Sequence, residues 1–353
     1  MDRLAIIGAG ISGLTAAWSL RAHPIEISIF EKSRGYSGRA ATRGKYGARY
    51  DHGANFIAPT SDAVRDILGE KLPTEALTKI EKEIWSFDRS GTLHSPADGS
   101  ETEMWTYARG ISTLGKLLAR EASAVTHTET RVESLRRDTD GSWRLMDVDG
   151  TNHGPFDAVL LTPPAPQTSS LLRETVMGAS ADESSRLDDL AEAVSDATYH
   201  PQFSYIFGYD RAIRRHGDYH GLKNGDGKHD ISWISFEHDK PERAADGMNI
   251  IVIQMSPRWT KPRVNSDPDE FVADVKEQAG KILDANLKRQ SWYDTQRWRY
   301  SLPAEGADGE RLAKGREVGL YFAGDYVAGK GRVAAAMETG LDVGTTIGTE
   351  VTA

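Results

Sequence analysis

The sequence of 353 residues contains no cysteine. This absence excludes disulfide bonds, thiolate nucleophiles, iron–sulfur clusters and a flavin tethered through a cysteine sulfur. Positive net charge is also missing, because 52 acidic residues against 43 lysines and arginines leave a formal charge of −9. Since binding to a phosphate backbone needs basic surfaces, this balance argues against nucleic acid as a partner.

Long apolar runs are missing as well. No stretch approaches the roughly 20 apolar residues that cross a bilayer, and Met1-Asp2-Arg3 leads directly into a strand-like run without the pattern of a secretory signal. We therefore expect a cytoplasmic protein with no membrane span. The 10 histidines show no spacing typical of metal ligands, and no G-x-S-x-G sequence supports a serine nucleophile.

What the sequence does contain is a β–α–β pattern near its start. Residues 4–7 form an apolar run typical of a buried parallel strand, apolar residues at helical spacing continue to about residue 22, and residues 25–30 form a second strand. Gly8-Ala9-Gly10-Ile11-Ser12-Gly13 stands between the first strand and the helix and fits G-x-G-x-x-G. In this context the motif predicts a dinucleotide-binding turn.

Each glycine of this motif has a physical role. Gly8 allows the tight turn, Gly10 lets the backbone approach a pyrophosphate, and Gly13 lets helix and strand pack closely. The start of the helix offers free N–H groups and a partial positive charge to phosphates. Glu31, at the end of the second strand, can accept hydrogen bonds from ribose hydroxyls. The turn alone does not distinguish NAD from FAD.

Two further segments favour FAD. The loop after Glu31 contains Gly38, which would give backbone access to the pyrophosphate, and Arg39, which would neutralise phosphate charge. Near the other end of the chain, Asp325 follows a strand and a glycine turn and can accept hydrogen bonds from ribityl hydroxyls. A helix beginning near Arg332-Val333 would point its dipole at the N1–C2=O edge of a flavin, where negative charge develops on reduction.

The rest of the sequence predicts the domain organisation. A hairpin signal at Asp140-Gly141 and an apolar strand at 157–162 continue the first pattern, whereas a polar helix near 180–196 precedes runs typical of antiparallel strands. Residues 32–53 show little regular pattern. We predict an α/β fold, with a Rossmann-type FAD-binding domain and a second α+β substrate domain. The FAD-binding domain would comprise residues 1–55, 107–166 and 300–353, and the substrate domain residues 56–106 and 167–299.

Taken in order, these segments resemble the renalase-like branch of the flavin-containing amine oxidase superfamily. The resemblance covers most of the chain, and is strong in the flavin segments and vague between residues 170 and 295. The matching residues are 6–14, 31–35, Gly38-Arg39, Asp51, 53–56, 110–112, 152–156, 163–167, Arg297-Trp298, Gly324-Asp325 and 331–333 leading to Gly340.

The resemblance implies a glutathione-reductase-like fold of the amine oxidase branch, with a non-covalent FAD and a small-molecule substrate. Enzymes of this branch oxidise dihydronicotinamide isomers: hydride passes to flavin N5, dioxygen accepts the electrons, and hydrogen peroxide and NAD(P)⁺ are released. The flavin carries this chemistry, so no catalytic side chain is singled out. The resemblance also implies further cofactor-binding residues besides those named above. They are Ile11, Ser12, Lys32, Asn55, Phe56, Val132, Gly324 and Ala336. The residues expected to line a substrate pocket are Phe56, Trp105, Gln254 and Trp298.

Two departures from the family pattern concern the shape of the second loop and the choice of activity, and the second one weakens the amine oxidase interpretation. The second loop reads Gly35-Tyr36-Ser37-Gly38-Arg39, where relatives commonly show adjacent glycines. Amine oxidases often use a lysine near flavin N5, but the corresponding strand, residues 250–255, has Gln254 as its polar member, and Lys261 lies beyond it. An amine or polyamine oxidase, or a desaturase, remains the alternative enzyme, and a non-catalytic flavin-binding sensor is the alternative of another class.

Overall fold

The computed structural model describes residues 1–97, 103–177 and 181–352, and the chain forms two compact units. The first unit draws on both ends and the middle of the chain, with residues 1–39, 114–199 and 302–353, and the second contains residues 40–113 and 200–301. These limits differ from the predicted domain boundaries. Residues 40–55 and 107–113 lie in the second unit, whereas residues 167–199 lie in the first, because the polar helix predicted near 180–196 packs there against another helix.

A sheet of five parallel strands forms the centre of the first unit. Its order is β20-β13-β1-β2-β9, so β1 lies in the middle and the chain leaves it for β2 on one side, while β13 pairs on the other. Ligands of such sheets bind where the strand order reverses, at the carboxyl ends of the strands. The strands are β1 (Arg3–Ile7), β2 (Glu26–Phe30), β9 (Val125–His127), β13 (Ala158–Leu161) and β20 (Leu320–Phe322).

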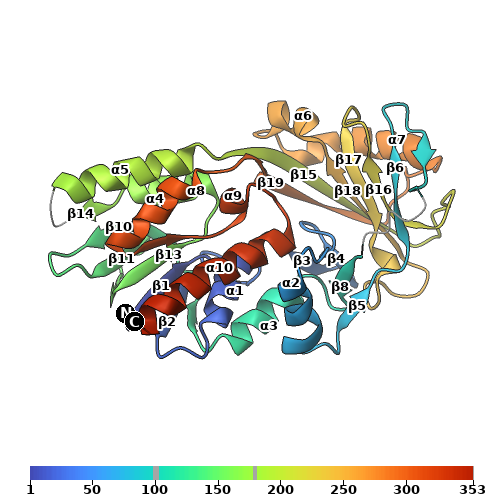
Figure 1. Cartoon of the computed structure of the whole chain (residues 1–353). Helices are drawn as coiled ribbons and strands as arrows, with labels where there is room; N and C mark the ends of the chain where they lie inside the picture. The colour runs from blue at the N-terminus through green and yellow to red at the C-terminus, as the bar shows by residue number, and fades with distance from the viewer. Residues whose placement is uncertain (98–102, 178–180, 353) are drawn as a thin grey trace. The chain divides into compact units, whose positions relative to one another are not determined.

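Two helices from opposite ends of the chain pack together in this unit. Figure 1 shows α10 (Val333–Thr352, red) beside α1 (Ile11–Ser19, blue), and their contact is extensive. Glycines four residues apart on α10 permit this approach: a Cβ on Gly340 would lie 2.4 Å from the carbonyl oxygen of Ser12, and one on Gly344 would lie 1.9 Å from Ser19 Oγ. The last helix is therefore fitted to the helix that follows the glycine turn.

A second, four-stranded sheet completes the first unit, in the order β12-β11-β10-β14. The hairpin predicted at Asp140-Gly141 joins β10 and β11, which pair antiparallel. Trp143 is fully buried at the centre of the core between these strands and the central sheet. The remaining elements of this unit are β10 (Val132–Arg137), β11 (Trp143–Asp147), β12 (Asn152–Phe156), β14 (Val176–Met177), α4 (Ala165–Arg173), α5 (Ala181–Ser195), α8 (Gly309–Ala313), the 3₁₀ helix η5 (Lys314–Val318) and α9 (Asp325–Ala328); α3 (Thr113–Glu121) begins at the limit of the unit.

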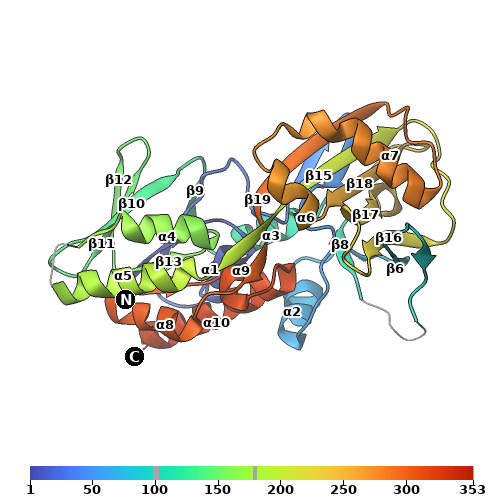
Figure 2. The same ribbon diagram turned by 90° about the horizontal axis from the view of Figure 1, so that it is seen from above.

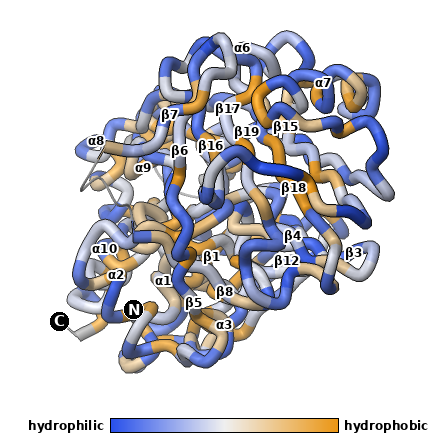
Figure 3. Tube along the Cα trace, turned by 90° about the vertical axis from the view of Figure 1, so that its right-hand side faces the viewer, coloured by the Kyte–Doolittle hydropathy of each residue, from blue (hydrophilic) through white to orange (hydrophobic). Residues whose placement is uncertain are grey.

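A seven-stranded sheet organises the second unit, in the order β19-β15-β18-β17-β16-β6-β7. The strand β18, third in this order, is apolar along most of its length (Figure 3), and it pairs antiparallel with β15 and β17, as predicted. The helix α7 (Val272–Leu283) packs its apolar face against this sheet (Figure 2). The strands are β6 (Glu83–Phe87), β7 (Leu93–His94), β15 (Thr198–Tyr209), β16 (Tyr219–Asn224), β17 (Ile231–Phe236), β18 (Asn249–Met255) and β19 (Trp292–Glu305).

Within residues 32–53, where the sequence shows little pattern, the structure contains a hairpin. The strands β3 (Thr42–Lys45) and β4 (Ala48–Asp51) pair antiparallel around a turn at Tyr46 and Gly47, both at positive φ. Both strands are only four residues long and carry charged side chains, so no apolar alternation marks them as strands in the sequence. The smaller elements are α2 (Asp62–Asp66), the π-helix η1 (Ile67–Lys71), β5 (Leu77–Lys79), β8 (Trp105–Tyr107), α6 (Pro257–Thr260) and the 3₁₀ helices η2 (Glu237–Asp239), η3 (Lys261–Arg263) and η4 (Pro268–Phe271). Among the described helices, none combines the length and the hydropathy needed to span a membrane.

Candidate functional site

The glycine turn follows β1 at the middle of the central sheet. Gly8 has φ +101°, and a Cβ there would lie 2.6 Å from Thr162 Oγ1, so the turn requires glycine. A Cβ on Gly13 would lie 2.4 Å from the carbonyl oxygen of Gly8. At Gly10, by contrast, a Cβ would meet no described protein atom within 4 Å. The absence of a side chain at Gly10 is thus not explained by the protein's own packing, and it leaves room against the backbone for a ligand.

The helix that follows this turn presents uncapped N–H groups. Gly10 is the N-cap residue of α1, and no side chain of the described residues accepts a hydrogen bond from the first turn, which begins with the buried residues Ile11 and Ser12. The first amides of a helix have no partner within the helix and favour an anion. The turn and helix start therefore form a suitable cradle for a phosphate.

Glu31 lies directly after β2 and is 8% exposed. Its Oε2 accepts the N–H of Ala9 at 2.9 Å, and its Oε1 accepts the N–H of Ser33 at 2.8 Å. Each carboxylate oxygen can accept a further hydrogen bond. The neighbouring Lys32 donates to Gln167 Oε1 at 3.0 Å, and burial lowers its pKa. Glu31 thus holds the glycine turn against the second loop and keeps acceptor capacity for a hydroxyl.

The second glycine loop lies against the first. Gly38 has φ +56°, and a Cβ on it would lie 3.2 Å from the Cα of Gly10. The N–H of Ser37 donates to the carbonyl oxygen of Ala9 at 2.8 Å. The structure thus brings together the two loops that the sequence predicted to hold one pyrophosphate.

Arg39 and Asp325 form an ion pair, although the sequence assigned them to different parts of a cofactor. The Asp325 side chain is 5% exposed, and its Oδ1 accepts the hydroxyl of Tyr199 at 2.7 Å. Burial would lower the pKa of Arg39, but the carboxylate of Asp325 raises it above its ordinary value. Gly324, at φ +136°, turns the chain so that Asp325 starts α9. The pair joins the second loop to the segment after β20.

The other predicted cofactor residues of the first unit lie at the starts of two elements. Val132 is the first residue of β10 and is 7% exposed. Val333 begins α10, Arg332 precedes it, and the N–H of Ala336 donates to the carbonyl oxygen of Arg332 at 3.0 Å. The predicted helix start after Asp325 is therefore present where the sequence placed it.

The predicted residues of the second unit gather around residues 52–57. Ile57 and Trp105 exchange two backbone hydrogen bonds of 2.8 Å, and the Phe56 ring lies 5.8 Å from that of Trp233. Gln254 Nε2 donates to the carbonyl oxygen of Gly53 at 2.7 Å. Trp298 Nε1 donates to the carbonyl oxygen of His52 at 2.9 Å, and the two rings stack at 5.4 Å. Gln254 and Trp298 thus hold the backbone of this segment.

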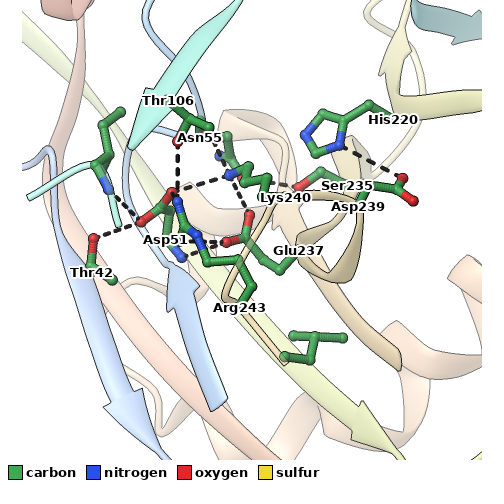
Figure 4. Close-up of polar contacts among 12 residues, drawn as sticks. Thr42, Asp51, Asn55, Thr106, His220, Ser235, Glu237, Asp239, Lys240 and Arg243 are labelled. Atoms are coloured by element: carbon green, nitrogen blue, oxygen red, sulfur yellow. Dashed lines mark hydrogen bonds and ion pairs between the residues drawn. The ribbon is translucent and has the colours of Figure 1, made fainter. Parts of the chain in front are cut away.

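Two residue groups near this segment were missed by the sequence analysis. His52 is 6% exposed, and burial lowers its pKa to about 4, with the charge of Arg43 acting in the same direction. The second group is a charge cluster of Asp51, Glu237, Lys240 and Arg243 (Figure 4), whose four side chains are 0% exposed. The short spacing of Glu237, Lys240 and Arg243 was the available signal, but charged residues in a loop are usually solvated.

Lys240 and Arg243 neutralise the two carboxylates. Lys240 Nζ bonds to Asp51 Oδ2 at 3.1 Å, Glu237 Oε1 at 2.5 Å and the carbonyl oxygen of Asn55 at 2.7 Å. Arg243 bonds to Asp51 Oδ2 at 2.8 Å and Glu237 Oε2 at 3.1 Å. Burial would raise the pKa of Asp51, but the charges of Lys240 and Arg243 hold it well below its ordinary value.

The parallel sheet, the glycine turn at its centre and the acidic residue after β2 define a dinucleotide-binding protein of the Rossmann type. Consistent with this class, residues 6–70 match the NAD(P)-binding Rossmann-like domain. More particularly, the chain belongs to the flavin-containing amine oxidoreductase family, which residues 90–347 match. The protein is therefore a flavin-dependent oxidoreductase, and because a Rossmann-type turn binds dinucleotides, its flavin is FAD. The space at Gly10 and the uncapped helix start fit this cofactor.

Curated relatives match a short part of the chain. Mitochondrial protoporphyrinogen oxidase of Nicotiana tabacum is 40% identical over 62 residues, which are 18% of this chain and 12% of that protein. Protoporphyrinogen oxidase 2 of Arabidopsis thaliana, chloroplastic/mitochondrial, is 31% identical over 68 residues, which are 19% of this chain and 13% of that protein. The matched stretch thus spans about an eighth of the length of these relatives.

Solved structures match the whole fold. A protein from Exiguobacterium sp. 255-15, provisionally named a protoporphyrinogen oxidase, has a TM-score of 0.77 and 17% identity over 99% of both chains. Wild-type putrescine oxidase bound to putrescine has a TM-score of 0.73 and 12% identity over 98% of both chains. Reduced UDP-galactopyranose mutase has a TM-score of 0.76 and 10% identity, covering 100% of this chain and 95% of that one. At these identities the likeness establishes the fold.

Proposed function

We propose that the protein is an FAD-dependent oxidase of dihydronicotinamide isomers, of the renalase-like branch. The substrate would give up a hydride and leave as NAD(P)⁺, and dioxygen would take the two electrons and become hydrogen peroxide. The bound FAD, held non-covalently, would supply the hydride acceptor at its N5. The protein's own task is then to bind the cofactor and the substrate, to orient them, and to exclude water.

The side chains of the first unit suit the binding part of this task. The amides at the start of α1, with those of the second loop, would hold the diphosphate, and Glu31 would accept a ribose hydroxyl through its remaining lone pairs. Asp325 would accept from the ribityl chain while Arg39 holds it in place. Lys32, Val132, Gly324, Val333 and Ala336 remain proposed cofactor residues, as do Asn55 and Phe56 of the second unit.

The choice of substrate rests on Lys240, whose ammonium group uses all of its hydrogens in bonds to other residues. Its side chain is 0% exposed, and its three N–H bonds go to Asp51, Glu237 and Asn55. It therefore has no hydrogen left for a water or an amine. The strand β18 offers Gln254 instead of a lysine. A dihydronicotinamide needs no base, because hydride departure directly yields an aromatic cation, so this substrate class requires neither Lys240 nor a lysine in β18.

The test begins with purified protein, whose visible spectrum should show a bound flavin. Anaerobic mixing with 6-dihydro-NAD should then bleach the flavin absorbance, whereas ordinary NADH should bleach it much more slowly. If no dihydronicotinamide isomer bleaches the flavin, this substrate class is wrong.

An amine oxidase is the second candidate, because the matched family is that of amine oxidoreductases. If primary amines or polyamines bleach the flavin and dihydronicotinamides do not, the protein is an amine oxidase. A non-catalytic flavin sensor is the remaining alternative. Peroxide release above that of free FAD, with any of these substrates, would exclude the sensor.

A further inference from the structure

Three aromatic side chains of the second unit are stacked together. The Tyr46 ring lies 4.9 Å from the Trp292 ring with 26° between the planes, and the Tyr50 ring lies 5.6 Å from the Trp292 ring with 29° between the planes. These values are those of offset-stacked rings in contact. Gly208 makes room for the arrangement, because a Cβ there would lie 2.0 Å from Trp292 Cε2. Trp292 therefore connects the two tyrosines.

The stack extends from the surface into the core of the unit. Tyr46, in the turn between β3 and β4, is 47% exposed, whereas Tyr50, on β4, is 0% exposed. Trp292 is the first residue of β19, and it packs against the same apolar cluster that contains Tyr50. The three rings thus form a continuous aromatic path between solvent and a buried phenol.

The buried end of this path has a proton acceptor. The hydroxyl group of Tyr50 donates to Asp294 Oδ2 at 2.6 Å, and Arg43 forms an ion pair with the same carboxylate. Burial would raise the pKa of Asp294, but the hydrogen bonds from Tyr50 and Arg43 hold it below its ordinary value. The pKa of Tyr50 is raised, first by burial and then by its bond to Asp294. A neutral phenol and a charged carboxylate therefore share a short hydrogen bond.

Trp292, in the middle of the path, has no such acceptor. Its Nε1 is buried and can only donate, and no atom of the described residues accepts a hydrogen bond from it. One-electron oxidation turns a phenol into a very strong acid, so a tyrosine is oxidised readily where its proton has a place to go. An oxidised Trp292 therefore keeps its proton and draws an electron from a neighbour, whereas an oxidised Tyr50 releases its proton to Asp294.

We propose that Tyr46, Trp292 and Tyr50 form a one-electron relay between the interior of the second unit and its surface. The relay is separate from the substrate chemistry proposed above and holds for any substrate of the flavin. Its oxidants are one-electron radicals such as the carbonate radical. Hydrogen peroxide, the product proposed above, is a source of such radicals, so the relay would protect the interior of the enzyme that makes it.

The steps of the relay balance in electrons and protons. The oxidant takes one electron from Trp292, and the Trp292 radical cation takes one from Tyr50, whose phenolic proton moves to Asp294. The products are reduced Trp292, a neutral Tyr50 radical and a protonated Asp294. In the return step an electron passes from Tyr46 through Trp292 to Tyr50, and Asp294 gives the proton back. Tyr46 releases its own proton to water, and a small reductant in solution, such as ascorbate, then reduces it.

The experiment generates azide radicals by pulse radiolysis in a solution of the holoenzyme, because this radical oxidises tryptophan in preference to other side chains. Absorbance follows the tryptophan radical, and electron paramagnetic resonance of samples frozen at successive times follows the tyrosine radical. In the wild type, a fast phase should convert tryptophan radical into tyrosine radical at a rate independent of protein concentration, as an intramolecular step requires. Trp292→Phe and Tyr50→Phe should each lose this phase.

A second tryptophan–tyrosine pair of the same unit supplies the matched control. The rings of Trp85 and Tyr219 lie 5.2 Å apart, but the Tyr219 hydroxyl is buried and has no hydrogen-bond partner among the described residues. Trp85→Phe and Tyr219→Phe should therefore leave the fast phase at its wild-type amplitude. If they lower it as Trp292→Phe and Tyr50→Phe do, or if the latter two leave it unchanged, the stack serves packing only and the proposal is wrong.

Two further variants test the ends of the path. Asp294→Asn keeps every ring in place and removes the base, so it should also lose the fast phase, and it decides the question if Trp292→Phe does not fold. In the wild type, ascorbate should shorten the lifetime of the tyrosine radical in proportion to its concentration, because Tyr46 is exposed. In Tyr46→Leu the radical on the buried Tyr50 should outlast the same ascorbate treatment. Equal lifetimes in the two proteins would overturn the connection to the surface.

Discussion

Arg39 and Asp325 lie 286 positions apart in the sequence and form an ion pair in the folded protein. One follows the second glycine loop, and the other begins the short helix after the last strand of the central sheet. The pair therefore ties the two ends of the chain together at the proposed cofactor site, and this gives the first prediction.

Arg39→Ala should lower both stability and FAD retention. It leaves the carboxylate of Asp325, 5% exposed, without its cation and with only the Tyr199 hydroxyl as a partner, which should cost about 1–3 kcal/mol of unfolding free energy. Urea denaturation of the apoprotein measures this loss. Lys281→Ala is the control, because Lys281 pairs with Glu277 on an exposed helix face and should change stability by less than about 0.5 kcal/mol. Equal stabilities of the two variants would contradict the structural role of the pair.

Gly10→Val should abolish FAD retention without unfolding the protein. The new side chain meets no described protein atom at its Cβ, but it fills the space into which we place the diphosphate. The ratio of flavin to protein absorbance measures retention, and the melting temperature of the apoprotein should stay close to wild type. Full flavin occupancy in this variant would show that the turn is misinterpreted.

Gly340→Val should have the opposite pattern. A Cβ at this position would lie 2.4 Å from the carbonyl oxygen of Ser12, a backbone atom that cannot rotate away, so a branched side chain forces α10 away from α1. Overpacking of this kind should cost about 1–3 kcal/mol or more of unfolding free energy. Thermal denaturation measures it, and the remaining folded fraction should still bind FAD more tightly than Gly10→Val does.

His52 predicts a dependence of stability on pH. Burial lowers its pKa to about 4, from an ordinary value of 6.5, so the folded protein favours the neutral ring. The unfolded chain then binds more protons between these two values, and stability falls as the pH drops from about 6.5 to about 4. The shift corresponds to a loss of about 3 kcal/mol over this window.

The variant His52→Asn isolates this contribution. His220 and His238 also have lowered pKa values, owing first to burial, and they act in the same direction, so the wild type must be compared with the variant at each pH. The free energy of unfolding of the wild type, relative to that of His52→Asn, should decrease as the pH falls from about 6.5 to about 4. Parallel stability curves from pH 7 to pH 4 would contradict a neutral, buried His52.

The parts of the fold that could be predicted are those with local signals. The β–α–β pattern with Gly8, Gly10 and Gly13 predicted the turn, and the order strand, glycine, Asp325 and helix was confirmed near the other end. Both features are encoded by short stretches of sequence, in which the spacing of glycines and apolar residues determines the local backbone conformation. The ion pair of Arg39 with Asp325 was not predicted, because 286 positions separate the two residues and no local spacing pairs them.

The parts that could not be predicted depend on distant partners. Glu237, Lys240 and Arg243 look like an ordinary charged loop, and nothing in their sequence neighbourhood shows that Asp51, nearly 190 residues earlier, removes them from water. Charges in a sequence are assumed to be solvated, and only the fold reveals the exceptions. The domain limits depend in the same way on which sheet each helix covers.

The fit of α10 to α1 has a consequence for the order of events during synthesis. The strand β20 and the helix α10 belong to the nucleotide-binding unit but are translated after every residue of the second unit. Until they leave the ribosome, one edge of the central sheet is unpaired and one face of α1 is uncovered. The nucleotide-binding unit therefore stays incomplete while the whole second unit emerges, and Asp325, at the start of α9, can join Arg39 only after that unit has been synthesised.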